Sequence, residues 1–301
     1  MSCSILLIGS SGQLGKELQQ ILAADNNLIT AGRSQIDLTQ PETIRHFIRK
    51  VQPQIIINAS AYTAVDQAEN EPEQAIAINA IAPGILAQEA HKIKALLLHI
   101  STDYVFDGYQ TRPYTETDAT NPLNVYGKSK LAGEQAIQNN CDKYLILRTA
   151  WVYSAYRNNF VKTMLKLGAN REEVCVVFDQ IGTPTWSRDV ADVVARLLCH
   201  TSNTTNTIYH YTNSGVASWY DFAVAIFTQA QQLGFPLKVQ RIIPISTAEY
   251  PTFAQRPAYS VLCCAKITAT LKIIPPHWQH SLKQMLTAYI QNNESADSLW
   301  R

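Results

Sequence analysis

The sequence predicts an α/β fold in which a doubly wound parallel sheet is followed by a smaller C-terminal α/β subdomain. Three observations support this prediction. Short apolar runs alternate with longer helical segments, which is typical of parallel sheets with crossover helices. The apolar runs are continuous, as strands buried on both faces require. The chain has 301 residues, enough for about two domains, and 46% hydrophobic against 16% charged residues favours an ordered core.

The alternation runs from the N-terminus to about residue 212. The expected strands cover residues 4–8, 28–31, 54–58, 95–100, 144–148, 174–178 and 207–211. The expected helices cover residues 13–24, 41–50, 72–91, 125–139 and 187–200. Each strand is thus followed by a segment long enough to cross back over the sheet, except that no helix is expected between residues 144–148 and 174–178.

Two helix starts carry capping signals. Thr39 and Glu42 predict a capping box with Pro41 in the first turn, and Ser218 with Asp221 predicts a similar start for a helix over 218–233. After residue 212 the alternation loosens, prolines accumulate, and a last amphipathic helix is expected from Pro276. We therefore expect a main domain over residues 1–155, to which 186–212 return, and a subdomain made mainly by 156–301.

Composition excludes several classes of function. The 25 basic and 24 acidic residues give a net charge of +1, too small for a surface that binds nucleic acid. The longest uncharged apolar stretch, residues 75–87, falls short of the ~20 residues that span a bilayer. The N-terminus has no signal-peptide pattern and the six cysteines form no Cys-x-x-Cys motif. We expect a cytoplasmic protein that binds neither nucleic acid nor membranes.

The first chemical signal lies between the first expected strand and helix. Gly9, Gly12 and Gly15 follow the strand at a spacing of three residues. Glycines there permit a tight turn, bring the backbone close to a pyrophosphate and let the helix pack closely, while the N–H groups of the helix face the anion. The position favours a Rossmann-type dinucleotide site over a turn with no ligand.

The end of the second expected strand indicates which dinucleotide binds. A carboxylate there would accept hydrogen bonds from the ribose 2′-hydroxyl of NADH. The sequence has Ala31, Gly32 and Arg33 instead. A guanidinium pairs well with phosphate, so we expect NADPH to be preferred, with NADH as the alternative cofactor.

The second signal is a Tyr-x-x-x-Lys pattern on an expected helix. Tyr126 and Lys130 lie four residues apart and therefore share one face. We expect the ammonium to lower the pKa of the phenol and make it a usable proton donor. Thr102 follows the fourth expected strand, whose carboxyl end is where ligands bind in open α/β sheets, and its hydroxyl is expected to bond the same substrate oxygen.

The combined motifs resemble the extended short-chain dehydrogenases and, within them, the dTDP-4-dehydrorhamnose reductases. The resemblance covers nearly the whole chain and rests on several segments: residues 9–15, 58–66, 101–108, 122–134, 148–153, 159–160, 179–185 and 256–257. It implies NADPH-dependent reduction of the C4 keto group of dTDP-4-dehydro-β-L-rhamnose to dTDP-L-rhamnose, a precursor of cell-surface polysaccharide.

The resemblance also implies roles for individual residues. Tyr126 would donate the proton, Thr102 would stabilise the developing oxyanion, and Lys130 would keep the proton mobile. Implied cofactor-binding residues are Gly9, Gly12, Gln13, Leu14, Gly15, Arg33, Asp37, Leu38, Ala59, Ala61, Tyr62, Thr63, Tyr126 and Lys130. Implied substrate-binding residues are Thr102, Asp103, Tyr104, Trp151, Asn159 and Arg256.

The chain departs from the family at one feature. Some relatives bind Mg²⁺ between subunits through several glutamates, whereas here only Glu17 matches. His277 and His280 have a spacing that suits a metal, but no third ligand is near in the sequence. We expect no metal site, and the sequence leaves a homodimer open.

Two alternatives stay open at this point. A nucleotide-sugar epimerase or dehydratase of the same fold would retain its cofactor. A noncatalytic NADP-binding regulatory subunit, like that of methionine adenosyltransferase, would reduce no sugar, although the presence of Thr102, Tyr126 and Lys130 argues against it.

Overall fold

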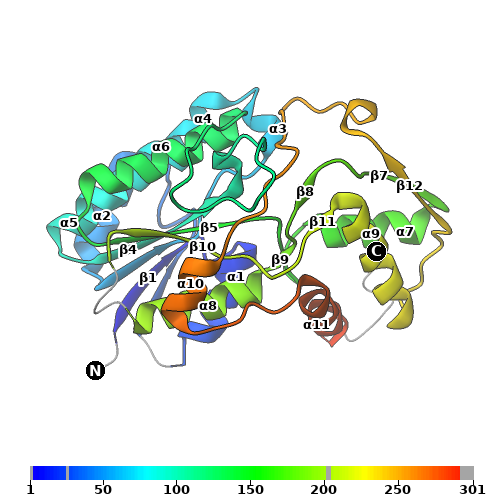
Figure 1. Ribbon diagram of the computed structural model, residues 1–301. Coiled ribbons are helices and arrows are strands. Elements are labelled where there is room, and N and C mark those ends of the chain that lie inside the picture. Colours follow the sequence, from blue (N-terminus) through cyan, green and yellow to red (C-terminus); the bar gives the residue numbers. More distant parts are fainter. Residues whose placement is uncertain (1–2, 25–26, 201–204, 292–301) are drawn as a thin grey trace.

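A six-stranded parallel sheet forms the centre of the molecule (Figure 1). The computed structural model describes residues 3–24, 27–200 and 205–291. The strands lie in the order β10-β5-β4-β3-β1-β2. Their bounds are β1 Ser4–Ile8, β2 Asn27–Ala31, β3 Ile55–Asn58, β4 Leu96–Thr102, β5 Tyr144–Thr149 and β10 Thr207–His210. The predicted doubly wound fold is confirmed.

Helices cover both faces of this sheet because its strands are apolar on both sides. Leu7 packs with α1 (Gln13–Leu22) and α8 (Ser187–Cys199). Its neighbour Leu6 packs on the other face with α2 (Pro41–Val51) and α5 (Ala82–Lys92). Successive strand residues point to opposite faces, so each strand contributes to two cores. The helix α6 (Val125–Asn140) lies beside α5 on the second face.

The chain reverses its direction of winding between β1 and β3. It first adds β2 on one side of β1 and then returns to add β3 on the other. Gly9, directly after β1, has φ +84°, and a Cβ atom there would lie 2.7 Å from the backbone nitrogen of Ser60, just after β3. Ligands of open α/β sheets bind at such a reversal, outside the carboxyl ends of the strands.

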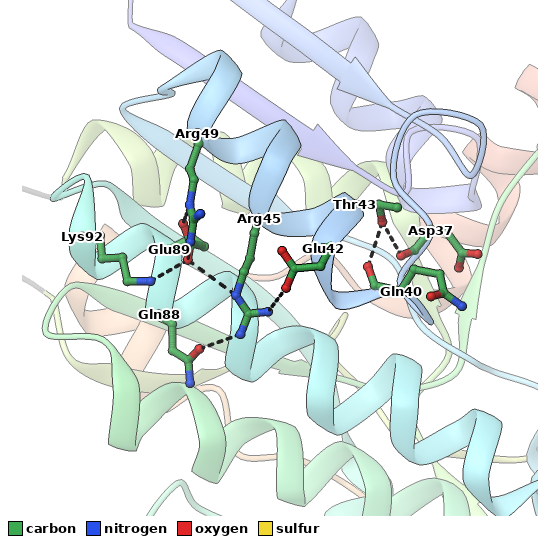
Figure 2. A network of polar contacts seen from close by, with 9 residues as sticks. All are labelled: Asp37, Gln40, Glu42, Thr43, Arg45, Arg49, Gln88, Glu89 and Lys92. Atoms are coloured by element: carbon green, nitrogen blue, oxygen red, sulfur yellow. Dashed lines mark hydrogen bonds and ion pairs between the residues drawn. The ribbon is translucent and has the colours of Figure 1, made fainter.

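A buried carboxylate joins α2 to α5 on the outside of the sheet (Figure 2). Glu89 is fully buried and accepts hydrogen bonds from Arg49 at 2.7 and 2.9 Å. Lys92 donates to the same carboxylate at 2.7 Å. These bonds hold the pKa of Glu89 down, at about 2, against the opposing effect of burial.

A second core lies beyond the sheet, among α7 (Phe160–Asn170), α9 (Trp219–Gln232) and α11 (Trp278–Gln291). The strand expected over residues 174–178 is present as β7 (Glu173–Val177). It pairs with β12 (Arg241–Ile245) in a separate small sheet, so our expectation that it continues the alternation of the main sheet was wrong. Two further pairs are short: β6 (Val152–Tyr153) with β9 (Thr185–Trp186), and β8 (Ile181–Gly182) with β11 (Ala217–Ser218).

Segments of the C-terminal half return to the main sheet. The helix α8 packs on α1, and β10 pairs with β5. The helix α10 (Ala265–Leu271) also places Ile267 and Leu271 in the core on the α1 face. The domain boundary near residue 155 stays a prediction.

Of the two capping boxes that the sequence predicted, one was wrong and one was confirmed. Thr39 does not cap α2: the N-cap residue is Gln40, without a side-chain bond, because the Thr39 hydroxyl donates to Asp37 at 2.7 Å. Ser218 and Asp221 do form the capping box of α9.

The single helix expected over 72–91 is interrupted. It consists of α4 (Pro72–Ile76), the π-helical turn η1 (Ala77–Ile81) and α5, and a short α3 (Val65–Ala68) precedes them. The interruption matters, because π turns often occur at functional sites and this one contains Asn79.

Candidate active site

Thr102, Tyr126 and Lys130 come together at the carboxyl end of β4. Thr102 is the last residue of this strand, while Tyr126 and Lys130 occupy the first turns of α6. Asn124 caps α6 by accepting from the backbone of Gly127 at 2.8 Å. A Cβ atom at Gly127 would lie 2.3 Å from the carbonyl oxygen of Tyr104, so only glycine lets α6 start this close to the strand end.

The Thr102 hydroxyl lies between three polar partners. It donates to the Asp103 carboxylate at 3.0 Å and accepts from the backbone of Tyr104 at 3.2 Å. It is also hydrogen-bonded to Tyr126, which lowers the pKa of that phenol. The Thr102 hydroxyl has one proton, which can be donated to Asp103 or to a Tyr126 phenolate but not to both at once.

Tyr126 is a weaker acid than we expected. Burial raises its pKa to about 12, which outweighs the opposing effect of Thr102. We predicted that the ammonium of Lys130 would lower this pKa, and that prediction was wrong. Lys130 Nζ is bound elsewhere: it donates to the carbonyl oxygen of Ile100 at 2.7 Å and lies 3.1 Å from His99 Nε2.

Two further buried groups have shifted pKa values. Burial lowers the pKa of Lys130 to about 8, against the favourable charge of Glu134. Burial raises the pKa of Asp103 to about 6, although Ser260 and Thr102 lower it by hydrogen bonding. Strongly shifted groups in one place are typical of catalytic sites.

The glycine turn after β1 fits a dinucleotide. A Cβ atom at Gly15 would lie 2.1 Å from the carbonyl oxygen of Gly9, and Gly12, the N-cap of α1, makes no side-chain bond to the helix. The first N–H groups of α1 are thus left to an anion from outside. Leu14 is buried under the turn, and Gln13 accepts from Asn159 at 3.0 Å.

The loop after β3 is clamped by the π turn. Asn79 accepts from the backbone N–H of Tyr62 at 2.8 Å and donates to its carbonyl oxygen at 3.0 Å. It also donates to Ser129 on α6 at 3.0 Å. Ala59, Ala61, Tyr62 and Thr63 are partly buried or exposed along this loop. Sequence reasoning missed Asn79, because it treated the segment as an ordinary helix.

Two of the predicted cofactor-binding residues after β2, Arg33 and Asp37, are exposed. Arg33 is exposed immediately beyond the strand, and Leu38 is partly buried. Asp37 is exposed and accepts from the hydroxyl and the backbone N–H of Thr39, which lower its pKa.

Three of the predicted substrate-binding residues, Trp151, Arg256 and Tyr104, are held by contacts with other side chains. Trp151 has φ +46° and stacks on Trp219 with ring centroids 3.5 Å apart. Arg256 binds Asp66 at 2.6 Å, and Tyr104 packs edge-on against Tyr126. Sequence reasoning missed Trp219, since no motif connects it to Trp151.

The part of the chain that the structure describes has neither a metal-binding cluster nor a membrane-spanning helix. In residues 3–24, 27–200 and 205–291, no group of three His, Cys, Asp or Glu side chains is arranged to hold a metal ion. Nor does any helix within these ranges have the length and apolar character to cross a membrane.

A glycine turn at the reversal point of a parallel sheet, with Tyr126 and Lys130 beside Thr102, defines a nicotinamide-dependent oxidoreductase of the short-chain dehydrogenase type. Residues 3–291 match the family model of the RmlD substrate binding domain. The dTDP-4-dehydrorhamnose reductase of Escherichia coli K12 is 44% identical over 289 residues, 94% of this chain and 97% of that protein. The chain belongs to the dTDP-4-dehydrorhamnose reductase family.

Solved structures agree with this assignment. The dTDP-4-dehydrorhamnose reductase of Bacillus anthracis in complex with NADP superposes with a TM-score of 0.90 at 38% identity, covering 96% of this chain and 100% of that one. The ortholog from Clostridium acetobutylicum gives a TM-score of 0.88 at 40% identity, covering 94% and 98%.

Proposed function

We propose that this chain reduces the C4 keto group of dTDP-4-dehydro-β-L-rhamnose with NADPH to form dTDP-L-rhamnose. One observation carries the proposal: Thr102 and Tyr126 are hydrogen-bonded, with Lys130 one turn further along α6, at the sheet edge that also holds the glycine turn. The family match and the NADP complex of a relative support the substrate and the cofactor.

The cofactor would be held along the strand ends. The glycine turn and the N-terminus of α1 would bind its pyrophosphate. Arg33 would meet the 2′-phosphate, and its exposed guanidinium supports the preference for NADPH over NADH. Asp37 and Leu38 would lie beside the adenine, and residues 59–63 along the nicotinamide. When bound, the dihydronicotinamide supplies a hydride to the C4 carbon.

The chain's own residues handle the proton. Tyr126 donates its phenolic proton to the C4 oxygen as negative charge develops there. Lys130 then returns a proton to Tyr126, which its pKa of about 8 permits at neutral pH. Thr102 turns its hydroxyl from Asp103 to the same oxygen, an effect worth about 3 kcal/mol in other enzymes.

The sugar would be oriented by residues around this centre. Trp151 offers an indole ring that Trp219 holds flat, and Arg256 offers a guanidinium beside Tyr104. Asp103 and Asn159 complete the proposed set. A homodimer and a cytoplasmic location stay predictions.

The test is NADPH oxidation in the presence of dTDP-4-dehydro-β-L-rhamnose, with NADH and a no-sugar mixture run in parallel. We expect NADPH consumption that matches the dTDP-L-rhamnose formed, and slower turnover with NADH. If NADPH binds but is not consumed, the reductase proposal fails, and a regulatory subunit is the better account. Tightly bound NAD that is never consumed would favour the epimerase alternative.

A further inference from the structure

A buried chain of polar groups leads from the loop after β3 to Lys130. Ser60 donates its backbone N–H to Asn58 Oδ1 at 3.1 Å. Asn58 Nδ2 lies 3.0 Å from His99 Nδ1, and His99 Nε2 lies 3.1 Å from Lys130 Nζ. Asn58 and His99 are both 0% exposed and face each other across β3 and β4. The mechanism above uses Lys130 but not the two residues behind it.

The first hydrogen bond fixes the directions of the others. A backbone N–H can only donate, so the Asn58 atom that faces Ser60 must be the carbonyl oxygen. The Asn58 amide nitrogen then faces His99 Nδ1 and donates to it. His99 Nδ1 must therefore be unprotonated, and the neutral ring carries its proton on Nε2.

The His99 ring is neutral, because burial and the nearby charge of Lys130 hold its pKa well below the usual value. With its proton on Nε2, the ring would donate to Lys130 Nζ, which lies 3.1 Å away. An ammonium has three donors and no acceptor, so it cannot accept this bond, whereas a neutral amine can. Lys130 can accept from His99 and still donate to the Ile100 carbonyl only when it is an amine.

We propose that His99 is a positioning residue for Lys130: its ring donates to the neutral amine and so favours the amine over the ammonium. The proposal rests on the proposed function and deepens it. The Asn58 amide is the second positioning residue, because it alone decides which ring nitrogen of His99 carries the proton.

The hydrogen bond from His99 to Lys130 would favour the return of a proton from Lys130 to Tyr126. As Tyr126 gives its proton to the C4 oxygen, the Lys130 ammonium passes one N–H proton to the phenolate and becomes an amine. The new lone pair of Lys130 accepts from His99 Nε2–H, which stabilises the product of the transfer. Solvent then reprotonates the amine, so no proton is gained or lost by His99 itself.

The other charged and polar groups near Lys130 do not prevent its amine from accepting a hydrogen bond from His99. On its own helix, Tyr126 is neutral and Glu134 carries a charge that favours the ammonium. That carboxylate is shared, since Arg148 on β5 binds it at 2.6 Å and Ser101 on β4 donates to it at 2.5 Å. From β4 the carbonyl of Ile100 accepts, and from β3 Asn58 brings no charge.

The first experiment determines the tautomer directly and needs no activity. In the full-length protein with ¹⁵N-labelled histidine, long-range ¹H–¹⁵N spectra distinguish the two neutral forms, and loss of one signal set in His99→Phe assigns the resonance. We expect an unprotonated Nδ1 and a protonated Nε2. A His99 ring protonated on Nδ1 overturns the proposal, even if the sugar is reduced as proposed.

The second experiment reverses the tautomer. In Asn58→Asp, a carboxylate would accept from Nδ1–H and leave Nε2 as an acceptor for the Lys130 ammonium. We expect the alkaline limb of the pH profile of kcat to move up by about one pH unit, a tenfold change in proton affinity. An unchanged limb in a folded Asn58→Asp protein contradicts the proposal.

Two controls test whether the shift of the alkaline limb requires the His99 ring. One excludes a direct effect of the new carboxylate charge, and the other excludes a general effect of losing a buried histidine. In the double variant Asn58→Asp with His99→Phe, the upward shift should disappear. If it persists, the carboxylate charge acts without the ring and the proposal fails. His210→Gln removes another fully buried histidine from the same sheet and should leave the limb in place. If no variant or wild-type protein reduces the sugar, the proposed function fails while the tautomer still decides this inference.

Discussion

The carboxylate of Asp66 binds the guanidinium of Arg256, with nitrogen–oxygen distances of 2.6 and 3.1 Å. The two residues are 190 positions apart in the sequence. Asp66 lies on α3, beside the loop proposed to hold the nicotinamide, and Arg256 lies in the segment after η3 (Thr247–Glu249). The backbone N–H of Ala254 donates to the same carboxylate at 3.1 Å. The pair thus ties a segment of the C-terminal half to the edge of the site.

Breaking this pair should weaken substrate binding more than it weakens the fold. In Asp66→Asn we expect KM for the sugar nucleotide to rise about tenfold with kcat nearly unchanged, because Arg256 loses the partner that aims it. Partly exposed ion pairs add only ~0.2–1 kcal/mol to stability, so the melting temperature should fall little. Glu42→Gln, which removes an exposed partner of Arg45 on α2, is the control and should change neither. A lower melting temperature with normal KM would show that the pair is only structural.

Removing the phenolic hydroxyl should stop proton donation without loss of the cofactor. In Tyr126→Phe we expect kcat to fall by about 10²–10⁴, the usual contribution of a positioned acid, while the Kd for NADPH stays within about twofold. Steady-state kinetics and fluorescence titration measure the two quantities. Tyr209→Phe alters another buried tyrosine of the main sheet and should keep wild-type turnover. Normal turnover in Tyr126→Phe would remove the assigned proton donor.

Asp103 should make the protein less stable at neutral pH than in mild acid. Its folded-state pKa of about 6 lies above the unfolded value of about 3.9, so the native state favours the proton. Stability associated with this group is complete below pH ~4 and is lost as the pH rises through about 6.

Asp103→Asn should therefore raise the free energy of unfolding at pH 8 by on the order of 2–3 kcal/mol, with the gain vanishing near pH 4. Urea unfolding at several pH values measures this. Asp118→Asn is the opposite control, because hydrogen bonds from Arg112 hold the pKa of Asp118 well below its usual range. A destabilised Asp103→Asn protein at pH 8 would mean that the buried carboxylate is better satisfied than its surroundings indicate.

Glu89 should stabilise the packing of α2 on α5 at neutral pH (Figure 2). Its folded-state pKa of about 2 lies below the unfolded value of about 4.3, so this stability is present above pH ~4.3 and is lost as the pH falls toward 2. In Glu89→Gln we expect a loss of about 1–3 kcal/mol at pH 7, toward the lower end because Arg49 and Lys92 stay half exposed to water. Equal loss at pH 7 and pH 2.5 would argue against an ionic contribution.

Much of this fold could be predicted because the pattern of apolar residues is local. Short continuous runs such as residues 55–58 favour buried strands, and Gly9 to Gly15 mark the turn that follows the first strand. The capping box of Ser218 and Asp221 is likewise local, and the structure contains it. The prediction that Thr39 caps α2 was wrong because its hydroxyl donates to Asp37 instead, and residue spacing does not reveal this competing acceptor.

The details of the site depend on contacts between distant segments. Tyr126 and Lys130 lie four residues apart on one helix as expected, but Lys130 is bound to the carbonyl of Ile100, a contact that their spacing does not reveal. The stacking of Trp151 on Trp219 and the pairing of Asp66 with Arg256 have no sequence signal. A polar His99 inside an apolar strand was the one available sign of the network behind Lys130.

The most direct measurement of the central claim follows the hydride itself. NADPH that carries deuterium at both C4 positions of the nicotinamide is reacted with dTDP-4-dehydro-β-L-rhamnose, and the sugar product is examined by NMR. We expect dTDP-L-rhamnose with deuterium at C4 of the sugar, one atom per NADPH consumed. A product without deuterium at that carbon, or no product although NADPH binds, would contradict it.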